Sequence, residues 1–110
     1  MFVNIRHVKQ SKVNQFGEQI KHLREQKGLL QRQVANQLEI DTPMLSKIEH
    51  GERNAKREQV KTLSKIFNIS EEHLLSLWLA DKVFDVVKGE DVALKAMRVA
   101  EENVKHHKPR

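Results

Sequence analysis

The chain has 110 residues, of which 38% are hydrophobic and 32% charged, a balance typical of one small helical domain with short appendages. The absence of Cys excludes disulfides, thiolate metal sites and Cys nucleophiles, and no apolar run approaches the roughly 20 residues of a membrane span, so we expect a cytoplasmic protein. The formal net charge of +5 makes polyanions the first partners to consider.

Residues 1–13 are basic, because they carry Arg6, Lys9 and Lys12 and no acid. Their apolar residues fit a helical face poorly and strict alternation only in part, so we expect an N-terminal arm. Three alternatives stay open for it. It is a flexible terminus, an arm lying along DNA phosphates, or a short strand that pairs with a partner subunit.

The helical period begins after this arm. Phe16, Ile20 and Leu23 recur at helical spacing and predict a helix over residues 14–27. Gly28 follows, and a glycine directly after the last turn is the usual stop for a helix, since it adopts the left-handed conformation without strain.

Two short helices follow, over residues 31–38 and 42–50. Asp41 can cap the first turn of the second one, and Pro43 is tolerated there because those N–H groups have no helical acceptor. Gly51 ends this helix. Two short helices joined by a tight turn of three or four residues have helix-turn-helix geometry.

The remaining elements are also helical. Residues 51–57 predict a polar surface loop, and residues 58–67 a fourth helix. Ser70 caps a fifth helix whose apolar residues, up to Val87, are too dense for a single buried stripe. A last helix over residues 91–105 has one apolar face. The sequence therefore predicts an all-α fold.

Residues 16–74 resemble the phage-repressor type of helix-turn-helix proteins, the lambda repressor and Cro (Cro/CI-like) group often called Xre. The residues that carry the resemblance lie at the family's spacing across five helices: Ile20, Leu23, Arg24, Gly28, Gln31, Val34, Ala35, Leu38, Ser46, Ile48, Glu49, Gly51, Leu63 and Ile69. The resemblance implies a five-helix lambda-repressor-like domain over residues 14–79 that binds duplex DNA. Residues 80–110 then form a C-terminal extension of one or two further helices.

The resemblance implies that the helix over residues 42–50 enters the major groove. The side chains expected to read base edges are Thr42, Pro43, Met44, Ser46 and Lys47. The best-known phage repressors present Gln at the first two of these positions, so amide readout of adenine is absent and apolar contact with thymine methyls is favoured. Lys47 is expected to bond guanine, with a phosphate contact as its alternative, and for Met44 a place in the core stays open.

Other residues are expected to hold the DNA backbone or the fold. The expected backbone contacts are Gln31, Arg32, Arg53, Asn54, Lys56 and Arg57, with a merely solvated face as the alternative. Leu30 departs from the family, which often has a capping Ser, Thr or Asn there. Arg24 and Glu49 resemble a pair that bridges the first helix to the end of the third, so we expect a structural ion pair.

The apolar residues of the C-terminal region exceed what one docked helix should bury, and this predicts a twofold homodimer. The residues expected at its interface are Leu77, Trp78, Val83, Phe84, Val87 and Met97. A dimer would bind a near-palindromic operator, and a cap folded onto the same chain is the alternative. The residues after Leu79 are too few for a separate ligand-binding domain, so regulation by a small ligand is not expected.

We expect no enzyme, metal site or cofactor, because the six His lack zinc-binding spacing and no phosphate loop or nucleophile elbow occurs. The prediction is a sequence-specific transcriptional regulator, a repressor or controller protein, whose partners are double-stranded DNA, a second copy of itself and RNA polymerase. The alternative is an antitoxin or adaptor whose C-terminal helices bind a partner protein such as a toxin, with DNA binding secondary.

Overall fold

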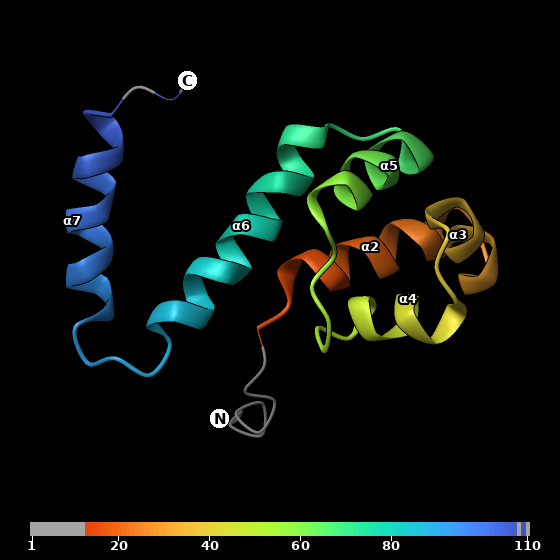
Figure 1. Cartoon of the computed structure of the whole chain (residues 1–110), viewed down its shortest axis with the longest axis horizontal. Coiled ribbons are helices and arrows are strands. Elements are labelled where there is room, and N and C mark those ends of the chain that lie inside the picture. The colour runs from red at the N-terminus through yellow and green to blue at the C-terminus, as the bar shows by residue number, and fades with distance from the viewer. Residues whose placement is uncertain (1–12, 108, 110) are drawn as a thin grey trace.

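The computed structural model describes residues 13–107 and residue 109, and this part of the chain contains helices and no strand (Figure 1). The N-terminal arm expected over residues 1–13 lies outside the described residues, apart from Val13. The helices are α2 (Gln15–Gln26), α3 (Gln31–Leu38), α4 (Thr42–Glu49), α5 (Arg57–Phe67), α6 (Glu71–Val87) and α7 (Ala93–Lys105). The predicted all-α class is confirmed.

Helices α2 to α6 pack around one hydrophobic core, which is mostly aliphatic and includes Phe16 and Phe67. The side chains buried most completely come from all five of these helices: Ile20, Val34, Leu45, Val60, Leu63 and Leu74. Ala35 on α3 is also buried and belongs to this core. The apolar face of each helix therefore turns towards the same centre.

Short polar side chains satisfy the free N–H groups at the helix starts. Asp41 Oδ1 accepts a hydrogen bond from the Met44 backbone N–H at 2.9 Å, as its position before α4 predicts. Ser70 Oγ accepts from the His73 N–H at 3.1 Å at the start of α6, again as predicted. These caps are local features, so the sequence was sufficient to locate them.

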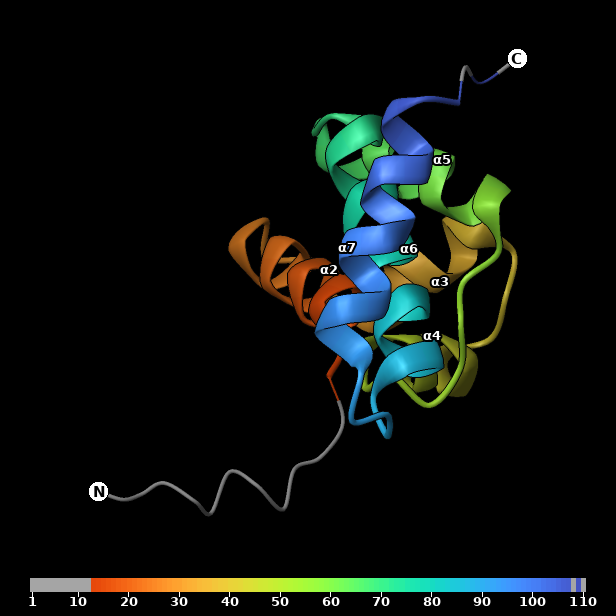
Figure 2. The same cartoon turned by 90° about the vertical axis from the view of Figure 1, so that its left-hand side faces the viewer.

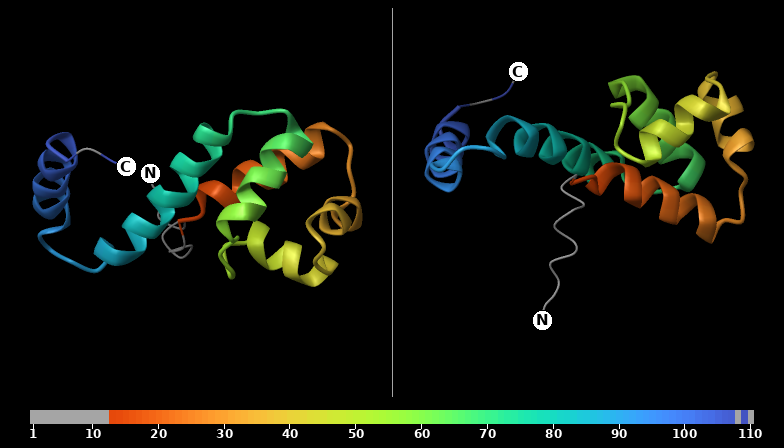
Figure 3. Two further views of the ribbon diagram at one scale, coloured as in Figure 1. Left: turned by 45° about the horizontal axis from the view of Figure 1, so that its top comes forward. Right: turned by 90° about the horizontal axis from the view of Figure 1, so that it is seen from below.

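Helix α7 stands apart from the body formed by α2 to α5 and follows α6 after a short turn (Figure 1). Seen from below, α6 extends from this body and carries α7 at its far end (Figure 3). All of α7 is exposed except the half-buried Ala93, so α7 does not cap the body. Helix α6 is continuous across residues 79 and 80, where we expected a domain boundary.

Candidate nucleic-acid interface

The turn between α3 and α4 sets the angle at which the two helices meet. It begins at Glu39, whose φ of 59° and ψ of 42° are left-handed. The Ile40 backbone N–H donates to the Ala35 carbonyl at 3.0 Å, which closes the end of α3. A side chain in this conformation costs about 1 kcal/mol relative to Gly, so packing of the neighbouring helices must hold Glu39 there.

A buried carboxylate joins α4 to α2 and α3. The Glu49 side chain is fully buried, and Arg24 donates to it twice, from Nε to Oε2 at 2.7 Å and from Nη2 to Oε1 at 3.1 Å. Gln31 Nε2 also donates to Glu49 Oε1, at 3.0 Å. Arg24 Nη1 reaches the Leu29 carbonyl at 3.0 Å. The structure thus places the two expected partners of the ion pair in a bidentate contact.

The contacts with Glu49 change the pKa of Arg24 and occupy part of the Gln31 amide. The hydrogen bond to Glu49 raises the pKa of the Arg24 guanidinium, and desolvation opposes that shift only in part. Arg24 therefore keeps its charge at neutral pH. Gln31, expected on a DNA phosphate, donates one amide hydrogen to Glu49 inside the protein, and the residue as a whole is half-buried.

A second contact with the end of α4 comes from the start of α2. Asn14 Nδ2 donates to the Glu49 carbonyl at 2.7 Å, and Asn14 Oδ1 accepts from the Gly17 N–H at 3.1 Å. A Cβ at Gly17 would lie 2.5 Å from the Ile48 carbonyl oxygen, so the close approach of α2 to α4 requires glycine. Asn14 was expected inside the helix over residues 14–27, although Asn is a frequent cap directly before a helix, and nothing in the sequence indicated the crossing.

The five side chains expected to read bases do not share one environment. Pro43 and Lys47 are exposed, whereas Thr42, Met44 and Ser46 are half-buried. Met44 packs against the core and its Sδ accepts a hydrogen bond from Arg53 Nε at 3.4 Å. The alternative of a partly core-bound Met44 therefore fits the structure. His50, which we had not expected on this surface, is exposed at the end of α4, with its Nδ1 2.8 Å from the Ser46 carbonyl oxygen.

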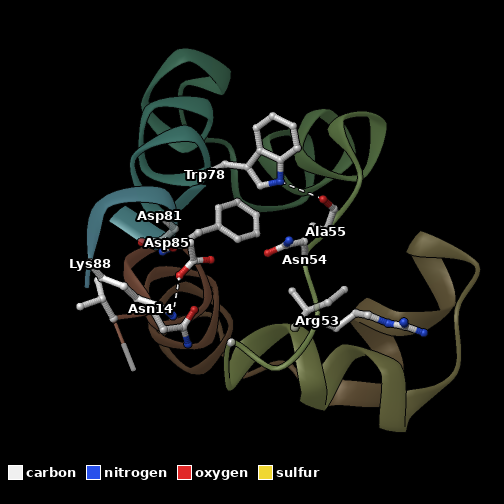
Figure 4. A pocket seen from close by; sticks show the side chains of 12 residues that line it. Asn14, Arg53, Asn54, Ala55, Trp78, Asp81, Asp85 and Lys88 are labelled. Atoms are coloured by element: carbon white, nitrogen blue, oxygen red, sulfur yellow. Dashed lines mark hydrogen bonds and ion pairs between the residues drawn. The ribbon is translucent and has the colours of Figure 1, made fainter. Parts of the chain in front are cut away.

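The exposed residues expected on the DNA backbone include two arginines with different neighbours, one beside α4 and one over Trp78. Arg32, Arg53, Asn54, Lys56 and Arg57 are all exposed. Arg53 extends towards α4, away from Trp78 (Figure 4). Arg57 instead lies over the Trp78 ring, 5.5 Å from its centroid, and Lys82 lies 4.5 Å from the same centroid. Arg53 is therefore nearer to the surface of α4 than Arg57 is.

Leu30 and Lys56 precede α3 and α5 without a side-chain cap. Each gains a different polar contact, because a glutamine in the first turn reaches back to its backbone N–H. Gln33 Oε1 accepts from the Leu30 N–H at 2.7 Å, and Gln59 Oε1 accepts from the Lys56 N–H at 2.8 Å. At Leu30, where the family often has a capping side chain, this contact from Gln33 is the polar contact that remains at the start of α3.

Helix α6 holds both the loop after α4 and the start of α2. Trp78 Nε1 donates to the carbonyl of the buried Ala55 at 2.8 Å (Figure 4). Asp81 accepts from the Gln15 and Phe16 N–H groups at 3.1 and 3.0 Å. A polar pocket of about 150 Å³ lies between these contacts. No sequence pattern pointed to Asp81, because its partners lie more than 60 residues away.

The residues expected at a dimer interface also differ in their surroundings. Leu77 and Trp78 are partly buried against the core of their own chain. Val83, Val87 and Met97 line an open apolar groove between α6 and α7, and Phe84 is half-buried. Of this set, Val83, Val87 and Met97 thus lie on a surface that residues 13–107 leave uncovered.

The described part of the chain brings together no group of three or more His, Asp or Glu side chains that could hold a metal ion. Among these same residues, no helix has the length and apolar character needed to cross a bilayer.

Comparison with known proteins identifies the region just described. A family model described as a helix-turn-helix domain matches residues 17–80. The HTH-type transcriptional activator BcrR of Enterococcus faecalis is 37% identical over 62 residues, which cover 56% of this chain and 30% of that protein. The chain therefore spans less than a third of the length of this relative.

Proposed function

Because this chain belongs to the helix-turn-helix domain family, we propose that it is a sequence-specific DNA-binding transcriptional regulator of the phage-repressor type. The observation that carries the proposal is the way α4 is held. Asp41 caps its first turn, the buried Glu49 ties its last turn to α2 and α3, and Pro43 and Lys47 on it remain exposed. A rigid helix with an uncovered face is what insertion into a major groove requires.

In this proposal α4 reads bases through its uncovered side chains. The exposed Lys47 bonds guanine O6 and N7, and the exposed Pro43 contacts thymine methyl groups together with the half-buried Thr42 at the start of the helix. Met44 contributes less, since it packs against the core and its sulfur accepts a hydrogen bond from Arg53, and Ser46 is half-buried as Thr42 is. His50 joins the reading surface at the far end of the helix.

The backbone contacts come from the flanking segments. Arg32 at the start of α3 and Arg53, Asn54 and Lys56 in the loop bind phosphates on either side of the groove, and the amide of Gln31 joins them. Arg57 reaches a phosphate only at the edge of this surface, since its guanidinium lies over Trp78. These contacts fix orientation and add salt-dependent affinity without reading sequence.

The regulator acts as a homodimer on a near-palindromic operator, with two half-sites about one helical turn apart. A dimer bound across a promoter occludes polymerase, and one bound beside a promoter can contact it. The relative in Enterococcus faecalis is named an activator, so a reporter assay must be able to detect both an increase and a decrease in transcription.

The test is selection of bound sites from random duplexes, followed by titration of the best site at several salt concentrations. Lys47→Ala should relax the preference at one base pair, where a good bidentate contact discriminates by about 1–3 kcal/mol. Arg53→Ala should weaken all sequences alike and make the salt slope about one unit shallower. Lys95→Ala, an exposed cation on α7, is the matched control and should change neither.

If neither Lys47→Ala nor Arg53→Ala alters binding to the best site, the surface assignment is wrong. If no sequence is enriched while the protein remains folded, sequence-specific DNA binding itself is wrong.

A further inference from the structure

An apolar groove of about 260 Å³ separates α6 from α7. Its walls are Val83, Val86 and Val87 on α6 and Ala96, Met97 and Ala100 on α7. The exposure of Val86 is 78%, although Val belongs to the residue types that are most often buried. Figure 2 shows the two helices of this hairpin one in front of the other, with α7 on the side away from the body. The part of the chain that the structure describes thus leaves both walls in contact with water.

The apolar face of α7 is wider than α6 can cover. At 100° per residue, the apolar side chains span an arc of roughly 220°, whose edges are Val99 and Leu94, with the polar Asn103 and Glu101 inside it. Lys95, Arg98 and Glu102 lie on the opposite side. A helix that packs against one neighbouring surface needs an apolar stripe of about 100°. The wider arc of α7 is typical of a helix with neighbours on two sides, as in a helical bundle.

We propose that α7 of a second copy occupies this groove, while α7 of the first copy occupies the groove of the second. This rests on the homodimer of the proposed function and names its contact surface. A twofold axis makes the contact reciprocal, so one interaction covers both walls in both copies and leaves no further open surface. Ala93, Ala96 and Ala100 on the inserted helix allow close approach to the groove walls.

The size of the contact is sufficient for a dimer. A helix of 13 residues is about 20 Å long and about 10 Å wide, so an arc of this width presents on the order of 350 Å². With the α6 wall included, two copies bury on the order of 1,000 Å² in total, which is the lower size for a specific interface. We therefore expect a reversible dimer at micromolar concentration.

The position of the groove links dimerisation to DNA binding. Helix α6 runs without interruption from Leu74 in the core to Val87 at the groove, and Asp81 and Trp78 attach it to α2 and to the loop after α4. The distance between the two α4 helices of a dimer is then set by a rigid helix rather than by a flexible linker.

The experiment compares two substitutions on α7 that change the net charge equally. Ala96→Glu places a carboxylate in the groove, and Arg98→Ala removes a cation from the opposite face. Sedimentation equilibrium at micromolar concentration should show dimers for the wild type and for Arg98→Ala. Ala96→Glu should raise the dimer dissociation constant by roughly 100-fold or more, because an unpaired charge would be buried. Val86→Glu on the α6 wall should do the same.

Circular dichroism should show unchanged helix content in all variants, since Ala96 and Val86 are exposed in the single chain. A monomeric wild type overturns the proposal, and so does Ala96→Glu or Val86→Glu that still forms dimers as tightly as the wild type. Binding to a single half-site separates this result from the proposed function. If the protein forms a dimer that Ala96→Glu disrupts but binds no DNA, only the proposed regulator function is refuted. If the protein binds DNA as a monomer, only the groove contact is refuted.

Discussion

Replacing Glu49 with Gln tests whether the buried network fixes α4. The substitution keeps the shape of the side chain and removes its charge. Arg24 then loses its bidentate anionic partner, although its side chain is only 11% exposed and has little water to compensate. The new amide group also turns an N–H towards a guanidinium that has only N–H groups to offer.

The cost can be estimated from the burial of the pair. Removal of one partner from a buried ion pair typically costs about 3–5 kcal/mol, because the other charge stays buried without compensation. Arg24 keeps its hydrogen bond to the Leu29 carbonyl, so we expect about 3 kcal/mol, the lower end of this range. A domain of this kind is stable by about 5–15 kcal/mol in total, so this single change should be easily measured.

The assay is urea unfolding followed by circular dichroism. Asp85→Asn is the matched control, because Asp85 and Lys88 form an ion pair at 3.4 Å in which both side chains are more than half exposed. Such a pair contributes about 0–1 kcal/mol. The double variant Arg24→Met with Glu49→Met should recover much of the lost stability, since no charge then remains buried.

Two results would refute this reasoning. If Glu49→Gln is no more destabilising than Asp85→Asn, the buried pair contributes little. Alternatively, the double variant could lose as much stability as Glu49→Gln, and the cost would then come from packing rather than from the uncompensated charge.

Three further substitutions test other contacts by urea unfolding. Gly17→Ala should destabilise the fold by about 1–3 kcal/mol, although Ala favours helices, because its Cβ would meet the Ile48 carbonyl at 2.5 Å; equal stability would show that the crossing is not tight. Glu39→Gly should stabilise it by about 0.5–1 kcal/mol by relieving the left-handed φ of 59°, and a loss of stability would contradict the strain. Trp78→Phe removes the hydrogen bond to the Ala55 carbonyl and should lower the free energy of unfolding by about 1 kcal/mol. It should also weaken the phosphate contacts of the loop after α4. Unchanged salt dependence of DNA binding would show that Trp78 does not hold this loop for DNA.

Features within a few residues could be predicted from the sequence. The spacing of Phe16, Ile20 and Leu23 located α2, and Asp41 and Ser70 located the starts of α4 and α6. Helix formation and capping depend on groups three or four residues apart, so their signals are local. The pair of Arg24 and Glu49 was expected from the family resemblance, and the structure adds Gln31 as a third member.

The environment of each candidate site residue required the tertiary structure. Met44 and Lys47 lie on one short helix, yet the first packs against the core and the second is exposed. Arg57 and Arg53 belong to one basic segment, yet they lie over different neighbours. A sequence pattern shows that a surface is basic, whereas the packing of the loop decides where each cation lies.

The sequence by itself therefore determined the helices, the caps at Asp41 and Ser70, and membership of the helix-turn-helix class. Only the tertiary structure decided how these helices are held and which faces stay uncovered. Trp78 contacts Ala55, Asp81 contacts Phe16, and α7 remains away from the body. The physical reason is distance along the chain: the backbone hydrogen bonds of a helix join neighbours in sequence, whereas these contacts join segments that only folding brings together.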